Sequence, residues 1–306
     1  MSRVQYSLTH DDALRLSATP ALAQLVARWL PFHAVSCDDG AAGITIDVVE
    51  PGVVELPASL PAVTLRMGET HCRVDGDVAW LDGPGVRARV DLAGGRATIE
   101  LDRAAPAVDV VPALTLPSAL LLARSRRYLL HCGAVEHPGG GVWLLAGDSR
   151  AGKTSTSLSL ARAGWGLLAD DHVVLRPLDD GWEVEGWPRL LHPDERWREG
   201  TPTGRRIDLD PRREPGVRLA GPGRLAGVLL PSVRGAEATA VTPARHSDAL
   251  SMLLRQTAWS VADRGVAARA LADLTAATSV PTLSLRLGLD TFGDPARLDA
   301  VLSSLP

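Results

Sequence analysis

The chain has 306 residues, of which 45% are hydrophobic and 22% are charged, and its formal net charge is −4. These values are ordinary for a globular protein, and the net charge gives no whole-chain basic character of the kind that binds nucleic acid or an anionic membrane. Cys37, Cys72 and Cys132 are too widely spaced for a disulfide framework or a zinc site. The N-terminus lacks the apolar core of a signal peptide, and no apolar run is long enough to span a bilayer. We therefore expect a soluble, cytoplasmic protein without a nucleic-acid or membrane partner.

The first third of the chain predicts a strand-rich α+β module over 1–111. A helix is expected over 20–30, because Thr19 can serve as N-cap and Pro20 suits the first helical position. The following segments alternate apolar and polar residues, as half-buried strands do. They cover 44–48, 62–67, 72–81 with an internal Asp-Gly turn, and a hairpin over 86–101. No group of catalytic residues stands out in this module.

Residues 112–306 are expected to form a second domain of α/β type. Residues 106–116 are interpreted as the connection and 117–127 as its first helix. Short apolar runs predict strands over 128–135, 142–146, 165–169, 173–176, 182–187, 225–231 and 282–287. Helical spacing predicts helices over 155–163, 246–259, 262–276 and 294–305, and the charged, Pro- and Gly-rich segment 190–213 predicts a long loop whose arginines are solvated or contact substrate.

The most informative stretch fits the phosphate-binding pattern G-x-x-x-x-G-K-[ST] and lies between a predicted strand and a predicted helix. Together with the next residue it comprises Gly147, Asp148, Ser149, Arg150, Ala151, Gly152, Lys153, Thr154 and Ser155. Backbone N–H groups and the helix N-terminus would face the phosphates of ATP. Lys153 would neutralise the β- and γ-oxygens, with Arg150 as a second positive charge, and Thr154 would offer its hydroxyl to Mg²⁺.

Lys153 is the only lysine in the chain, and the chain contains no asparagine. This composition is typical of a sequence in which arginine replaces lysine wherever it can. Arginine is a poor substitute in a phosphate loop, which needs a compact charge on a flexible stem. The alternative interpretation is a glycine-rich turn without a ligand. The lack of asparagine also argues against a eukaryotic-type protein kinase, which needs one as a metal ligand.

Asp170 and Asp171 follow the predicted strand 165–169, next in sequence after the loop and its helix. One carboxylate can hold Mg²⁺ and the other can accept the proton of an attacking hydroxyl, as phosphoryl transfer requires. The structural alternative is a turn or a helix cap. His131 lies beside an apolar run, where a histidine is usually a core residue.

His131-Cys132-Gly133, the loop 147–154 and Leu168-Ala169-Asp170-Asp171 together resemble the HPr serine kinase/phosphorylase family. The resemblance covers about fifty residues. It implies a P-loop kinase domain of HPr-kinase/PEP-carboxykinase type, in which Asp170 takes the proton from a serine, His131 is paired with it, and Lys153 is the catalytic phosphate ligand. Thr154 and Asp171 would then hold the metal. The chain differs from the family at Arg150, where the family has glycine, and lacks the downstream glycine-rich signature associated with phosphorolysis.

The C-terminal sequence is similar to that of a shorter branch of this family, the HPr-kinase-like tailoring kinases of lasso-peptide gene clusters. The segments that carry this similarity are 253–259, 263–266, 285–288, Asp290 and 292–295. The resemblance implies a precursor peptide as partner, phosphorylated on its C-terminal serine. Two alternatives stay open: a kinase of a small hydroxylated metabolite, and a nucleotide-binding regulator without transfer activity. The oligomeric state is also open, with a homo-oligomer among the options.

Overall fold

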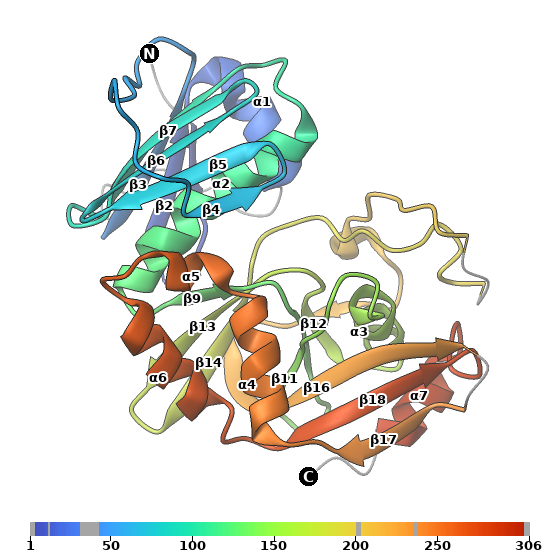
Figure 1. Ribbon diagram of the computed structural model, residues 1–306. Coiled ribbons are helices and arrows are strands. Elements are labelled where there is room, and N and C mark those ends of the chain that lie inside the picture. Colours follow the sequence, from blue (N-terminus) through green and yellow to red (C-terminus); the bar gives the residue numbers. More distant parts are fainter. Residues whose placement is uncertain (1–3, 12, 31–42, 200–202, 236–237, 303–306) are drawn as a thin grey trace. The chain divides into compact units, whose positions relative to one another are not determined.

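The computed structural model describes residues 4–11, 13–30, 43–199, 203–235 and 238–302. It has a mixed α/β fold and divides into two compact units (Figure 1). Unit 1 comprises Met1–Leu129 and Ala258–Ala270, and unit 2 comprises Leu130–Thr257 and Leu271–Pro306. Within the described part of the chain, no helix has both the length and the apolar character needed to cross a membrane.

Unit 1 is built on an eight-stranded sheet in the order β1-β2-β3-β8-β7-β6-β5-β4. Its strands are β1 (Val4–Ser7), β2 (Leu14–Ala18), β3 (Ile44–Val49), β4 (Leu65–Met67), β5 (Thr70–Asp75), β6 (Val78–Gly83), β7 (Val86–Asp91) and β8 (Arg96–Leu101). The predicted hairpins β5–β6 and β7–β8 are confirmed as antiparallel pairs. The predicted first helix is also confirmed as α1 (Pro20–Trp29), with proline at its start. The strands β1 and β2 were not expected from the sequence.

The helix α2 (Ala107–Arg124) packs on β7 and β8 and corrects two expectations. The segment 106–116 is the first half of this helix rather than a connection, and the expected boundary at 111/112 falls inside it. Pro112 and Pro117 lie within the helix. An interior proline costs about 3 kcal/mol, because it removes a hydrogen bond and crowds the preceding turn. Most of α2 is buried, so tertiary burial outweighs this cost.

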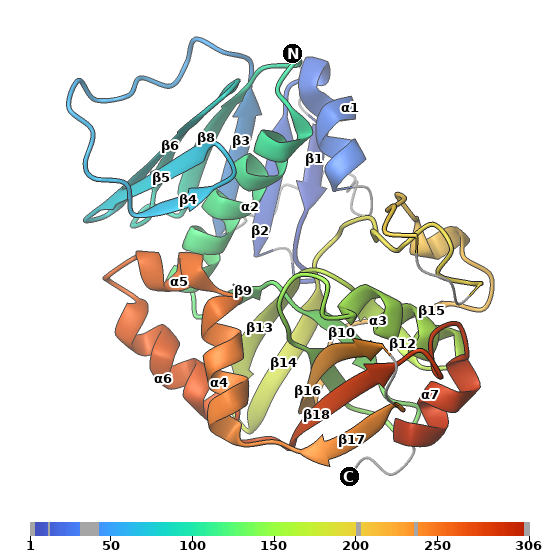
Figure 2. The same ribbon diagram turned by 45° about the vertical axis from the view of Figure 1, so that its right-hand side comes forward.

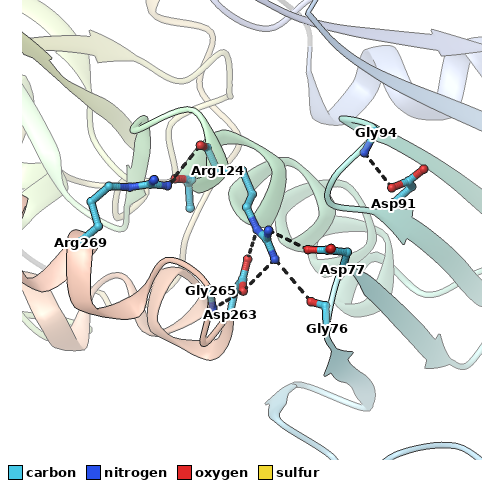
Figure 3. A network of polar contacts seen from close by, with 9 residues as sticks. Gly76, Asp77, Asp91, Gly94, Arg124, Asp263, Gly265 and Arg269 are labelled. Atoms are coloured by element: carbon cyan, nitrogen blue, oxygen red, sulfur yellow. Dashed lines mark hydrogen bonds and ion pairs between the residues drawn. The ribbon is translucent and has the colours of Figure 1, made fainter.

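Figure 3 shows why 258–270 belongs to unit 1. Arg124, at the end of α2, donates from Nε to Oδ2 of Asp263 over 2.5 Å and from Nη1 to Oδ1 of Asp77 over 2.8 Å. The Asp263 side chain is only 1% exposed. Arg269 donates to the backbone oxygens of Ala123 and Arg124 and so satisfies carbonyls at the C-terminal end of the helix. These contacts join α2 to a segment about 140 positions later in the chain.

Unit 2 contains a second sheet in the order β15-β12-β10-β11-β16-β14-β13, with β18 beside β16 and β17 beside β18. Its strands are β10 (Gly133–Glu136), β11 (Val142–Leu145), β12 (Gly166–Ala169), β13 (Val173–Leu178), β14 (Gly181–Gly186), β15 (Arg218–Leu219), β16 (Gly223–Gly235), β17 (Ala240–Pro243) and β18 (Thr282–Gly288). The short strand β9 (Tyr128–Leu130) spans the division between the units. The predicted pairing of β13 with β14 is confirmed.

The remaining helices are α3 (Lys153–Arg162), α4 (His246–Arg255), α5 (Ala258–Ala262), α6 (Ala267–Ala277) and α7 (Pro295–Leu302). In unit 2, α3 and α7 pack side by side (Figure 2) and share one apolar core with β10, β11, β16 and β18. Its largest side chains are Trp143 on β11, Trp165 just before β12, and Trp197. Through Leu158, Leu160 and Ala161 this core packs α3 against β10 and β12.

Candidate functional site

The sheet of unit 2 brings the predicted site residues to one edge. The strand β10 is antiparallel to both β11 and β12, so these two strands run in the same direction. The phosphate loop after β11 and the Asp170-Asp171 pair after β12 therefore lie at the same edge. The start of β10 lies there too, because that strand runs the opposite way. His131 stands just before it, where the expected continuous strand 128–135 is broken into β9 and β10.

The loop from Gly147 to Gly152 has the geometry that its glycines allow. Gly152, the N-cap of α3, has φ +101°, and a Cβ there would meet Leu287 Cδ1 at 2.6 Å. A Cβ on Gly147 would meet the Cβ of Ala151 at 2.9 Å. Arg150 has φ +65°, a left-handed conformation that is unfavourable for a residue with a side chain. Glycine would adopt this conformation without that cost.

Lys153 begins α3 and is buried, whereas Asp148, Ser149 and Arg150 are exposed at the tip of the loop. Its Nζ donates to the backbone oxygens of Gly147 (2.7 Å) and Asp148 (3.2 Å). Burial lowers the pKa of Lys153, while the charges of Asp171, Asp148 and Asp170 act to raise it. The ammonium group is therefore held inside the loop, close to the carboxylate pair.

Asp170 is a buried carboxyl group with a raised pKa. Its Oδ2 accepts a 3.3 Å hydrogen bond from the backbone N–H of His192. Burial, followed by repulsion from Asp171, raises its pKa to about 7, and hydrogen bonds from His192 and the Thr154 hydroxyl oppose this shift. A carboxyl group that titrates near neutrality is suited to accept a proton from a substrate.

Asp171 lies in the opposite electrostatic environment. Its Oδ1 is 2.8 Å from Nε2 of His131, its Oδ2 is 2.9 Å from Nδ1 of His172, and Arg189 donates to the same oxygen. These neighbours hold the pKa of Asp171 well below its usual range despite burial. The expected pairing of His131 with Asp170 is thereby corrected, because the ring contacts the second aspartate of the pair.

The residues present fit a magnesium ion at Thr154. Mg²⁺ is usually held by one or two protein oxygens together with phosphate oxygens and water. The Thr154 hydroxyl donates to Asp170, which leaves its lone pairs for a cation. Asp171, expected as the second ligand, is already engaged by three basic side chains. Among the described residues, no group of three or more His, Cys, Asp or Glu side chains is arranged to hold a metal ion.

His131 is positioned by its backbone, which donates to the carbonyl oxygen of Gln256 over 2.9 Å. The rings of His131 and His172 stack with their centroids 5.2 Å apart. The neighbouring Cys132 is buried, and burial raises the pKa of its thiol to about 12. It is therefore a neutral packing residue and not a nucleophile.

Two contacts to the aspartates come from Arg189, one residue before the segment 190–213 predicted as a long loop, and from His192 within that segment. The stretches 191–199 and 203–209 are the two arms of an irregular hairpin, with isolated bridges between Leu191 and Leu209 and between Asp194 and Arg206. His192, on the first arm, donates from its backbone to Asp170, and Arg189, two residues before that arm, donates to Asp171. Neither residue belongs to a motif with fixed spacing, and the sequence offered no signal beyond the high arginine content of the segment.

No protein-family model matches the chain, and no curated protein is similar to it in sequence. Among solved structures, the chain is similar to the HPr(Ser) kinase/phosphatase from Coxiella burnetii, with 9% sequence identity over 57% of this chain and 88% of that chain. The TM-score of this comparison is 0.32. Values this low do not assign the chain to a family.

Proposed function

We propose that this protein is an ATP-dependent kinase that transfers phosphate to a serine hydroxyl, namely that of the C-terminal serine of a lasso-type precursor peptide. The observation that supports a transfer reaction is that the phosphate loop and the Asp170 carboxyl group lie at the same edge of the sheet. A phosphate loop with the chain's only lysine lies within electrostatic range of a buried carboxyl group whose pKa is about 7. A protein that only bound nucleotide would need the first feature and not the second. The peptide acceptor rests on the sequence resemblance.

In this proposal the loop from Gly147 to Ser155 binds the triphosphate through its backbone N–H groups. Lys153 exchanges its contacts with the loop carbonyls for contacts with the β- and γ-oxygens. Thr154 holds Mg²⁺, which supplies charge neutralisation on the phosphate oxygens when bound. The exposed Arg150 can add a further positive charge from the loop tip.

Asp170 orients the serine hydroxyl and removes its proton. The serine oxygen forms a bond to the γ-phosphorus, the bond from that phosphorus to the β–γ bridging oxygen breaks, and ADP leaves with the electron pair. The proton stays on Asp170, whose buried surroundings favour the neutral form. Asp171 keeps its negative charge throughout, and it positions His131 and Arg189 around the reacting groups.

The test is phosphate transfer from Mg-ATP to a peptide that ends in serine, followed by mass spectrometry. Wild type, Lys153→Ala and Asp170→Asn would be compared with Asp180→Asn, which makes the same change at an exposed turn. We expect one added phosphate with wild type and the control, and none with the other two variants. ATP binding without transfer to this peptide would contradict the peptide acceptor and direct the test to small hydroxylated metabolites. Transfer unchanged in Asp170→Asn would contradict the base.

A further inference from the structure

The loop 189–214 carries seven arginines, at positions 189, 196, 198, 205, 206, 212 and 213. Six of them have a carboxylate within ion-pair distance. The pairs are Arg189–Asp171, Arg196–Glu199, Arg198–Glu214, Arg205–Glu195, Arg212–Asp210 and Arg213–Asp210. Among the residues that the structure describes, Arg206 has no such partner, and the three residues of this loop outside the description carry no charge.

The carboxylates closest to Arg206 along the hairpin are committed to other groups. Asp194, directly opposite in the bridge, accepts from the backbone N–H groups of Arg196, Thr203 and Gly204 and from the Thr203 hydroxyl. Asp208 lies with its Oδ1 3.4 Å from Nε2 of His192. Arg206 is therefore an exposed cation whose charge is not neutralised by its own hairpin.

The position of Arg206 relative to Asp170, the proposed base, follows from two hydrogen bonds that both involve the backbone of His192. Nη1 of Arg206 donates to the backbone oxygen of His192 over 3.0 Å. The backbone N–H of the same His192 donates to Oδ2 of Asp170 over 3.3 Å. Since the nitrogen and oxygen of one residue are less than about 4 Å apart, the guanidinium lies within about 10 Å of the Asp170 carboxylate. One of its nitrogens is used, and the other donors remain for a ligand.

The backbone around Arg206 is fixed rather than loose. The hairpin is held by backbone hydrogen bonds from Ile207 to Pro193 (3.0 Å) and from Glu195 to Arg205 (2.8 Å). A guanidinium on a fixed backbone, near a proton acceptor and without its own counter-charge, matches the planar geometry of a carboxylate.

We propose that Arg206 binds a carboxylate of the phosphate acceptor, placed about one serine residue away from the hydroxyl that receives the phosphate. A serine at a free C-terminus has this spacing, because its α-carboxylate lies two bonds from the carbon that bears the hydroxyl. A separation of up to about 10 Å accommodates that span with one hydrogen bond at each end. This inference rests on the proposed function, and it assigns Arg206 as a specificity-determining residue for the acceptor.

The experiment uses peptides that end in serine as the free acid or as the carboxamide, and free L-serine as the small carboxylate source. Wild type is compared with Arg206→Gln and with the matched control Arg205→Gln, whose arginine already pairs with Glu195. We expect wild type and the control to prefer the free acid over the carboxamide by roughly 10- to 100-fold in KM, the range of a charge-assisted hydrogen bond. Arg206→Gln is expected to raise the acceptor KM for the free acid by a similar factor and to abolish the preference, without a change in KM for Mg-ATP. If the KM for free L-serine rises by the same factor in Arg206→Gln, the carboxylate that Arg206 binds is that of a small metabolite rather than of a peptide C-terminus.

Equal KM values for acid and carboxamide in wild type would overturn the inference. An effect of Arg206→Gln on KM for Mg-ATP, with the preference kept, would overturn it as well and assign the arginine to the phosphates. A second readout separates this inference from the kinase reaction: fluorescence anisotropy of a labelled peptide ending in alanine, as acid and as carboxamide. Binding of the acid that depends on Arg206, in a protein that transfers no phosphate, would leave the inference standing and remove the proposed function. Absence of both binding and transfer would overturn both.

Discussion

Nε2 of His131 lies 2.8 Å from Oδ1 of Asp171, and this contact helps to give the adjacent carboxyl groups of Asp170 and Asp171 different pKa values. With His172 and Arg189 on its other oxygen, Asp171 stays ionised. Its neighbour Asp170 is stabilised in the charged form by hydrogen bonds from Thr154 and the His192 backbone and by the charge of Arg189, but these do not offset its burial. Adjacent carboxylates repel, so the better-compensated one keeps its charge and the other titrates near neutrality.

The first prediction concerns the pH dependence of phosphate transfer. The proposed base must be ionised, and the pKa of Asp170 is about 7. At saturating Mg-ATP we expect kcat/KM for the acceptor to fall about tenfold per pH unit below this value and to level off above it. A profile that stays flat down to about pH 5 would rule out Asp170 as the base.

The second prediction concerns Arg189, a positioning residue that acts through both aspartates. Its charge lowers the pKa of Asp170 and that of Asp171. In Arg189→Gln we therefore expect the midpoint of the pH–rate profile to move to higher pH. The control is Arg224→Gln, which breaks an exposed pair with Asp180 and is expected to leave the midpoint in place. An unchanged midpoint in Arg189→Gln would mean that this arginine has a purely structural role.

The third prediction concerns stability. The folded-state pKa of Asp170 is raised above that of an unfolded aspartate, so its contribution to stability is present at low pH and is lost as pH rises to about 7. Asp170→Asn mimics the neutral form. We expect it to melt a few degrees above wild type at pH 8 and to show a smaller difference at pH 5. A variant that melts lower than wild type at pH 8 would contradict the assigned environment.

The fourth prediction uses the fact that Lys153 is the chain's only lysine. An amine-selective acylating reagent should modify this side chain and the N-terminal amine, and Mg-ATP should protect the lysine, as read by peptide mass spectrometry. Lys153→Arg should bind ATP roughly 100-fold more weakly, because the guanidinium does not fit the space between the carbonyls of Gly147 and Asp148. Acylation that is indifferent to Mg-ATP would show that the loop does not hold the phosphates.

The fifth prediction concerns the pair Arg124–Asp263 in unit 1. Arg124→Met leaves the buried Asp263 carboxylate without its cation, and we expect a loss of about 3–5 kcal/mol in the free energy of unfolding. Arg124→Met combined with Asp263→Leu should recover much of this loss, as measured by denaturant unfolding. Arg66→Met breaks the exposed pair with Glu69 and should cost less than about 1 kcal/mol. A loss below about 1 kcal/mol in Arg124→Met would show that the network contributes little to the free energy of unfolding.

The sequence by itself was sufficient for the features that depend on local patterns. Strand, glycine loop and helix were predictable around 147–155 because the phosphate loop has fixed spacing and special backbone angles, and Gly152 shows such an angle. The hairpins β5–β6 and β7–β8 were predictable because alternation and turn residues act over a few positions. The identities of Lys153 and the Asp170-Asp171 pair as candidates followed from motif and order alone.

Tertiary structure decided the rest, because the responsible contacts join residues that are far apart in sequence. His131 pairs with Asp171 across 40 positions, and Arg189 and His192 contact the aspartates from a hairpin and the residues just before it, which have no local signature. Pro112 and Pro117 argue against a helix locally, but burial of α2 outweighs their cost. Local patterns report backbone preference, whereas the pKa of a carboxylate and the division of the chain into units depend on burial and on long-range partners, which only the folded chain brings together.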